Sequence, residues 1–208
     1  PVAVPPPPAA SPPASDGDLT GALLEADLTG AQDVWDRLAR VVSVESLSAD
    51  IVLPAHRALI DAESAGGMAR PALLRARAFL ERKATVLLDH AGPDLGHPAI
   101  CLAITGDDRL PALVLAIVLA RAGFRIVTPL LDLAALETVA VIRDVAPALT
   151  IVVRDNPAGR HIAALTDLLP GQEVAVWSPL GNDGAPPSSL RHLPASPTDA
   201  AQALRHER

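Results

Sequence analysis

The spacing of hydrophobic and polar positions changes near residue 98, and this change separates two patterns along the chain. Before it, apolar side chains recur at helical spacing in the segments 18–26, 30–42, 46–62 and 70–90. We expect a helix in each segment, with Thr29 as the N-cap of the second and Pro54 kinking or dividing the third. Short connections between such helices favour an antiparallel bundle.

After residue 98, short apolar strand segments alternate with helical ones. Strands are expected at 99–104, 125–129, 150–154, 173–177 and, as a short fifth, 190–193, and helices at 110–122, 133–145, 158–169 and 198–206. Such alternation is typical of a parallel sheet. The predicted fold class is therefore α/β, an N-terminal helical bundle followed by a flavodoxin-like, doubly wound parallel five-stranded sheet in the order 2-1-3-4-5.

This pattern predicts the organisation of the chain. Residues 1–17 are rich in proline, alanine and serine and are expected to be a disordered linker, residues 18–91 the bundle, 92–98 a Gly- and Pro-rich hinge, and 99–208 a Rossmann-like domain. The chain begins with proline and no methionine, so we interpret it as a fragment or processed form and expect an N-terminal domain before it.

Composition narrows the function classes. The net charge is −7, and only 2% of residues are aromatic. Binding DNA normally needs a basic face, and binding single strands needs aromatic stacking platforms, so we expect no direct DNA binding. The longest apolar run, 110–120, is too short to span a bilayer. A single cysteine fits a reducing, cytoplasmic compartment.

The turn after the first predicted strand carries the most informative chemistry. It lies at the carboxyl end of a strand, where ligands bind in doubly wound folds. Its residues 107–112 resemble the cobalamin-binding loop Asp-x-His-x-x-Gly, with Asp107, Arg109 and Ala112 at the three motif positions. Arginine cannot replace the histidine as a cobalt ligand, because it stays protonated.

Further segments carry the same resemblance along residues 19–203. They are 23–31, Leu53-Pro54 followed by Arg57, Gly106-Asp107, 122–127 and 145–149. Together they resemble the cobalamin-binding module of methionine synthase and, more closely, that of the light-sensing, cobalamin-dependent regulators of the MerR type. The resemblance implies the bundle-plus-flavodoxin-like fold and a cobalamin held by the axial histidine.

The chain departs from this family at the positions that would hold the cofactor. Alignment on Leu53-Pro54 places Glu63 where a bundle Trp caps the cobalamin, and Leu73 and Leu74 where a Glu-His pair follows. Ala112 replaces a glycine that lets the nucleotide tail pass close to backbone. Arg154-Asp155-Asn156-Pro157 replaces a Ser/Thr-rich strand end. We therefore expect cobalamin, the family's cofactor, to be absent here.

The candidate site is the carboxyl edge of the sheet facing the bundle. Its predicted residues come from the ends of the first, third and fourth strands: Asp107, Asp108, Arg109, Arg154, Asp155, Asn156 and Trp177. Two interpretations remain open, a closed ion-pair network that fills the cleft or a set of charges that receives a polar ligand. For the Asp107-Asp108 turn, an alternative is a solvated turn that caps the next helix.

Other residues support simpler interpretations. Asp89, His90, Asp94 and His97 carry metal-ligand chemistry, but a solvated hinge is the favoured interpretation. Cys101 is expected to be a buried thiol and Trp35 part of the bundle core. Trp177 is either packing or pocket wall.

The sequence lacks a phosphate-binding glycine loop, zinc-finger spacing and a nucleophile elbow. We therefore predict a non-enzymatic regulatory or sensor module that acts through a different ligand or through protein contacts. Its partner is a transcriptional regulator or the missing N-terminal domain, and a homo-oligomer is possible. Alternatives are a cobalamin-binding carrier or photoreceptor domain with histidine-independent ligation, and a degenerate enzyme domain acting through Asp107 and Asp108.

Overall fold

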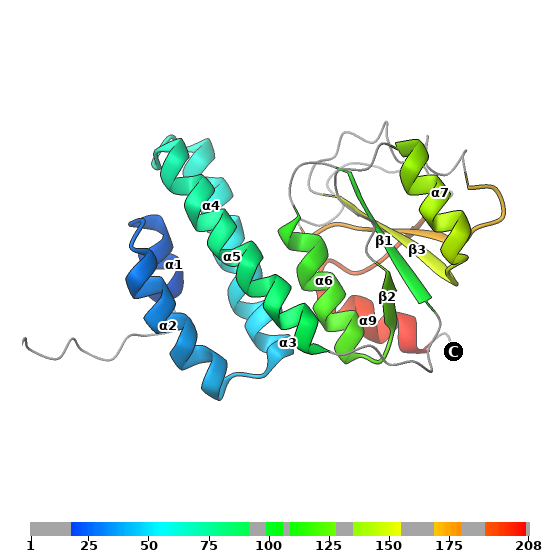
Figure 1. Ribbon diagram of the computed structural model, residues 1–208, viewed down its shortest axis with the longest axis horizontal. Helices are drawn as coiled ribbons and strands as arrows, with labels where there is room; N and C mark the ends of the chain where they lie inside the picture. Colours follow the sequence, from blue (N-terminus) through cyan, green and yellow to red (C-terminus); the bar gives the residue numbers. More distant parts are fainter. Residues whose placement is uncertain are drawn as a thin grey trace, which may run out of the picture.

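The computed structural model describes residues 18–91, 99–105, 109–127, 135–154, 169–179 and 190–206. The helical half of the chain is seen in Figure 1 beside the sheet. Its elements are α1 (Asp18–Leu24), α2 (Leu28–Val41), α3 (Val44–Ser46), the π-helical segment η1 (Leu47–Val52), α4 (Leu53–Ser64) and α5 (Arg70–Ala91). The predicted linker at 1–17 and hinge at 92–98 lie outside the described residues.

The start of α2 differs from the sequence prediction. Asp27, and not Thr29, is the N-cap, and its side chain accepts a hydrogen bond of 2.9 Å from the Gly30 backbone N–H. A Cβ at Gly30 would lie 2.3 Å from a carboxylate oxygen of Asp27, so a larger residue there would displace the capping carboxylate from this position. The cap therefore lies two residues before the predicted one.

Pro54 acts as expected on the third helical segment. A proline has no backbone N–H, so it cannot complete a turn with a preceding carbonyl. The chain passes through the wider turns of η1 immediately before it, and Pro54 occupies the first turn of α4. The segment is thus divided at Pro54 while the chain stays helical.

The sheet is the predicted one. Its strands are β1 (Ala99–Thr105), β2 (Arg125–Val127), β3 (Leu149–Arg154), β4 (Val174–Trp177) and β5 (Arg191–His192). They are parallel throughout and have the order β2-β1-β3-β4-β5, which confirms the fold class and strand order. The described helices are α6 (Leu110–Arg121), α7 (Ala135–Val145) and α9 (Pro197–His206). The helix predicted at 158–169 lies outside the described residues, apart from its last residue, Leu169.

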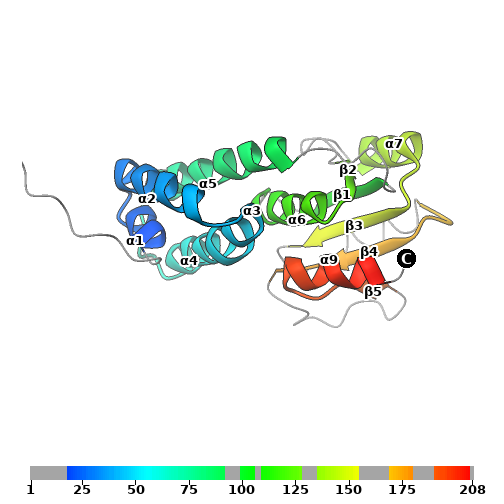
Figure 2. The ribbon, with the colours of Figure 1, turned by 90° about the horizontal axis from the view of Figure 1, so that it is seen from below.

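Helices cover both faces of the sheet (Figure 2). Side chains of α6 and α9 form one core with alternate residues of the strands, among them Leu102, Ile151 and Trp177. On the other face, Val139 and Ile142 of α7 pack with Cys101. Alternate strand residues point to opposite faces, which is why the strands are apolar on both sides.

Helix α6 belongs to both halves of the protein and lies between them in Figure 1. Every residue from Leu110 to Leu119 is buried. Leu113 and Ile117 pack into the bundle core, whereas Leu115 and Leu119 pack into the sheet core. A helix that is apolar on all sides needs neighbours on all sides, and here the bundle and the sheet supply them.

None of the helices in the described part of the chain is long and apolar enough to cross a membrane.

Candidate functional site

Strand register brings the predicted edge residues together in space. Thr105, the last residue of β1, lies opposite Arg154, the last residue of β3. Val153 lies opposite Trp177, the last residue of β4. The carboxyl ends of these three strands therefore form one continuous edge, as the strand order requires.

The described residues include part of the predicted site. Arg109 is exposed and lies immediately before α6, with no capping hydrogen bond from its side chain. Arg154 ends β3, and its side chain is outside the described part. Asp107, Asp108, Asp155 and Asn156 also lie outside the described residues. The choice between a closed ion-pair network and an open polar site therefore remains a prediction for these residues.

Trp177 is buried at this edge. Its side chain is 0% exposed and belongs to the core that α6 and α9 form with the sheet, on the side that faces the bundle. The indole Nε1 has no hydrogen-bond acceptor among the described residues. Trp177 therefore packs in the core, and it also brings an unpaired donor to the strand end.

A bundle residue that the sequence analysis did not place in the site reaches the same strand end. Arg57, in the second turn of α4, donates a hydrogen bond from Nη2 to the backbone carbonyl of Pro179. Pro179 is buried and follows Trp177 by two residues. The Arg57 Nε is also buried and has no partner among the described residues. Leu53-Pro54 was the only sequence signal near Arg57, and it indicated the fold and not this contact.

The end of the α4–α5 hairpin carries a second arginine. Arg77 on α5 donates from Nη2 to Oε2 of Glu63 on α4 over 3.1 Å, while its Nε is buried and unpaired within the described structure. Glu63 is thus the partner of an arginine. Leu73 packs in the bundle core at 1% exposure, and its neighbour Leu74 is 54% exposed.

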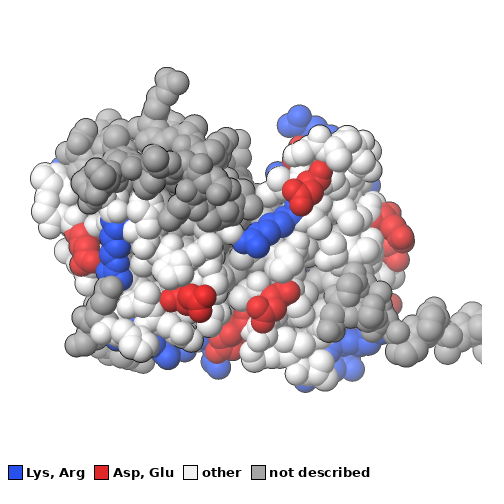
Figure 3. All heavy atoms as spheres, turned by 180° about the vertical axis from the view of Figure 1, so that it is seen from behind, with Lys and Arg blue, Asp and Glu red and all other residues white. Residues whose placement is uncertain are grey.

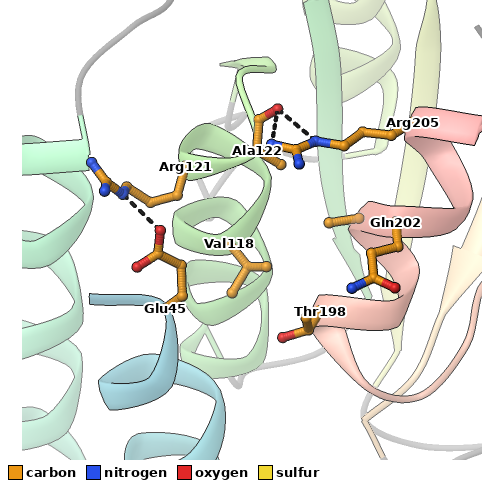
Figure 4. A pocket seen from close by; sticks show the side chains of 8 residues that line it. Glu45, Val118, Arg121, Ala122, Thr198, Gln202 and Arg205 are labelled. Atoms are coloured by element: carbon orange, nitrogen blue, oxygen red, sulfur yellow. Dashed lines mark hydrogen bonds and ion pairs between the residues drawn. The ribbon is translucent and has the colours of Figure 1, made fainter. Parts of the chain in front are cut away.

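A pocket of about 160 Å³ lies at the opposite end of α6, between α3, α6 and α9. Figure 4 shows that its charged groups are used within the protein. Arg121 Nε bonds Glu45 Oε1 at 2.9 Å, and Arg205 donates from Nε and Nη2 to the Ala122 carbonyl at 3.0 and 2.8 Å. Partial burial raises the pKa of Glu45, but hydrogen bonds from its own backbone N–H and from Arg121 outweigh burial, so the pKa is lowered. The contacts around this pocket therefore connect the bundle to α6, and the end of α6 to α9.

The remaining candidate residues have simple surroundings. Cys101 is fully buried in β1, and burial raises the pKa of its thiol to about 11. Asp89 and His90 are exposed near the end of α5, and Asp94 and His97 lie outside the described residues. Within the described ranges, no group of three or more His, Cys, Asp or Glu residues could hold a metal ion. Trp35 is in the bundle core, as predicted.

Comparisons with known proteins support the fold. No protein-family profile matches the chain, and no curated protein sequence matches it. Among solved structures, the monomethylamine corrinoid protein of Methanosarcina barkeri has a TM-score of 0.67 at 13% identity, over 91% of this chain and 96% of that one.

Two further solved structures are similar at lower scores. The methanol:cobalamin methyltransferase complex MtaBC of M. barkeri has a TM-score of 0.44 at 11% identity, over 92% and 78% of the two chains. A cobalamin-binding protein of Desulfitobacterium hafniense DCB-2 has 0.41 at 12%, over 92% and 98%. The first similarity, which covers bundle and sheet together, shows that this chain has the fold of that corrinoid protein.

Proposed function

We propose that this chain is a non-enzymatic regulatory or sensor module, which uses the cobalamin-binding fold without histidine-ligated cobalamin. It engages a different ligand, or a protein partner, at the carboxyl edge of its sheet. The observation that carries this proposal is Arg109. It lies directly before α6, at the motif position of the axial histidine, and its guanidinium has no lone pair to give to a metal. No described histidine lies at the ends of β1, β3 or β4 or in the first turn of α6.

Two further features of the structure support a poor fit for the cofactor. The methyl group of Ala112 is fully buried between α6 and the sheet, so it fills space that the motif glycine would leave open. On the bundle side, Glu63 pairs with Arg77, and Leu73 is part of the core, so neither is available as the family's capping Trp or Glu-His pair.

The rival function is a cobalamin carrier or photoreceptor domain with histidine-independent ligation. The similarity over nearly the whole chain to a corrinoid protein favours it. The two functions differ in a measurable way, because a carrier must bind cobalamin tightly and the proposed module must not.

Surface charge supports a protein or small-molecule partner over DNA. The chain has a net charge of −7. On the face seen in Figure 3, the described basic side chains alternate with acidic ones and form no continuous stripe. Non-specific DNA affinity comes mainly from phosphate neutralisation, which this surface does not favour. A transcriptional regulator, a preceding domain of the same protein or a second copy of the chain would be the partner.

The test is a titration of the purified chain with hydroxocobalamin and adenosylcobalamin, followed in the visible spectrum. The proposal predicts no tight binding and no spectrum of a histidine-ligated cobalamin. Arg109→His alone should not restore strong affinity, because Ala112 and the bundle positions remain unchanged. Tight binding of cobalamin by the unsubstituted chain would contradict the proposal. Tight binding in which the cobalamin keeps the visible spectrum of the free ligand would establish the rival function.

A further inference from the structure

Buried hydrogen-bond donors without acceptors occur in the bundle and at the end of β4. They include Arg57 Nε, Arg77 Nε and Trp177 Nε1, each shielded from solvent and unpaired within the described structure. A buried donor left unpaired is unfavourable, so a native structure rarely keeps several without a reason. All three groups are N–H donors, and Arg57 carries a positive charge, so an acceptor with negative charge suits it.

Two of these donors are placed at one strand end by a direct contact. Arg57 bonds the carbonyl of Pro179, which is two residues beyond Trp177. The Trp177 side chain lies on the face of the sheet covered by α6 and α9, and α6 also packs against the bundle. Arg57 reaches the strand end from the bundle. The guanidinium and the indole therefore both lie near the end of β4.

No contact among the described residues places the third donor, Arg77 Nε, at this strand end. Arg77 donates from Nη2 to Glu63, one residue before the end of α4, so its guanidinium lies at the end of the α4–α5 hairpin and already has an acidic partner.

The local charge favours an anion. The hydrogen bond that Arg57 donates goes to a neutral carbonyl, whereas Arg77 already has the exposed Glu63 as its acidic partner. The pocket of Figure 4 behaves differently, because Arg121 uses its Nε on Glu45 and Arg205 uses both Nε and Nη2 on a backbone oxygen. The Arg57 guanidinium is thus the one that brings an unpaired donor to the carboxyl edge.

We infer that the seam between α4 and the end of β4 binds a small ligand through an oxyanion, a phosphate or carboxylate group, which accepts hydrogen bonds from Arg57 and the Trp177 indole. This inference rests on the proposed function, since it names the ligand chemistry of the same edge. A planar guanidinium presents parallel N–H donors that match two oxygens of such a group, and the indole supplies one further donor.

The experiment uses Trp177 as the reporter. In a Trp35→Phe chain, Trp177 is the remaining tryptophan. Its emission is followed while inorganic phosphate, pyrophosphate or citrate is added at constant ionic strength, with sodium chloride as the salt control. We expect a saturable change with at least one of these anions and none with chloride. A preference for pyrophosphate over citrate assigns a phosphate group, and the reverse assigns a carboxylate.

Matched variants distinguish a specific effect of the Arg57 side chain on anion binding from a general effect of positive charge on the protein. Arg57→Gln should weaken the apparent affinity at least tenfold, and Arg57→Lys less, because lysine keeps the charge but not the paired donors. Arg82→Gln, on an exposed position of α5, should change it less than twofold. If Arg57→Gln melts at a much lower temperature, Arg57→Lys, which keeps the charge, provides the same test. Equal affinities for the seam variants and Arg82→Gln, or no saturable response to any of the three anions, would overturn the inference.

The cobalamin titration keeps this result separate from the proposed function. A chain that binds neither cobalamin nor these anions overturns the oxyanion inference and leaves the module with a protein partner. A chain that binds cobalamin through a protein nitrogen overturns the proposed function, whatever the anions do.

Discussion

Truncation of Ile117 tests whether bundle and sheet form one folding unit. Ile117 is fully buried on the bundle-facing side of α6. Ile117→Ala removes three carbon atoms, worth about 2.4 kcal/mol at about 0.8 kcal/mol each, and a residual cavity adds to this. We expect the free energy of unfolding to fall by about 3 kcal/mol. With a urea dependence of about 2 kcal/mol per molar, the midpoint falls by about 1.5 M.

The two tryptophans allow each half to be followed separately. Trp35 lies in the bundle core and Trp177 in the sheet core. Urea unfolding is measured by fluorescence in Trp177→Phe chains, where Trp35 reports, and in Trp35→Phe chains, where Trp177 reports. Because α6 is shared by both cores, Ile117→Ala should lower both midpoints equally. Val41→Ala, at an 81% exposed position, is the control and should change stability by less than about 0.5 kcal/mol.

One outcome would refute this reasoning directly. If Ile117→Ala lowers the midpoint reported by Trp35 and leaves that reported by Trp177 unchanged, the bundle unfolds independently and α6 does not couple the halves.

Three other predictions concern single contacts. The buried Cys101 thiol, with its pKa raised to about 11, should be alkylated at pH 8 far more slowly in the native chain than in urea; equal rates would show an accessible thiol. Because the pKa of Glu45 is lowered in the folded state, its bond to Arg121 contributes stability above the ordinary pKa of 4.5, and this contribution is lost as pH falls through the folded pKa. Glu45→Gln should therefore slightly reduce the acid dependence of the melting temperature. An unchanged profile of melting temperature against pH would count against the bond. The Lys83 ammonium lies 5.5 Å from the centroid of Trp35, and Lys83→Met should lower stability by about 0.5–1 kcal/mol and alter Trp35 emission; neither change would be seen if the contact does not form in solution.

The fold was predictable because its signals are local or periodic. The apolar sequence of α6 predicts a helix buried on all sides, and the alternation after residue 98 predicts a parallel sheet. The cap of α2 was predicted wrongly because Thr29 and Asp27 are both good cap residues. Gly30 leaves the Asp27 carboxylate room close to the backbone.

The candidate site was predictable only in part. The ends of β1, β3 and β4 follow from the strand order, so the sequence can place Arg109 and Trp177 at one edge. The contact of Arg57 with Pro179 joins residues 122 apart in the sequence, and no local pattern indicates it. The contact of Arg77 with Glu63, likewise, depends on how α5 packs against α4 and not on its own helix.

The most direct test of the account is the indole N–H signal of Trp177 in a proton–nitrogen correlation spectrum. The two indole signals are assigned with the Trp177→Phe chain, and pyrophosphate, phosphate or citrate is then added at constant ionic strength. If an oxyanion accepts a hydrogen bond at the seam, the Trp177 signal moves downfield and saturates, while the Trp35 signal in the bundle core stays in place. A Trp177 signal that does not move with any of the three anions would contradict the central claim that this edge receives an oxyanion ligand.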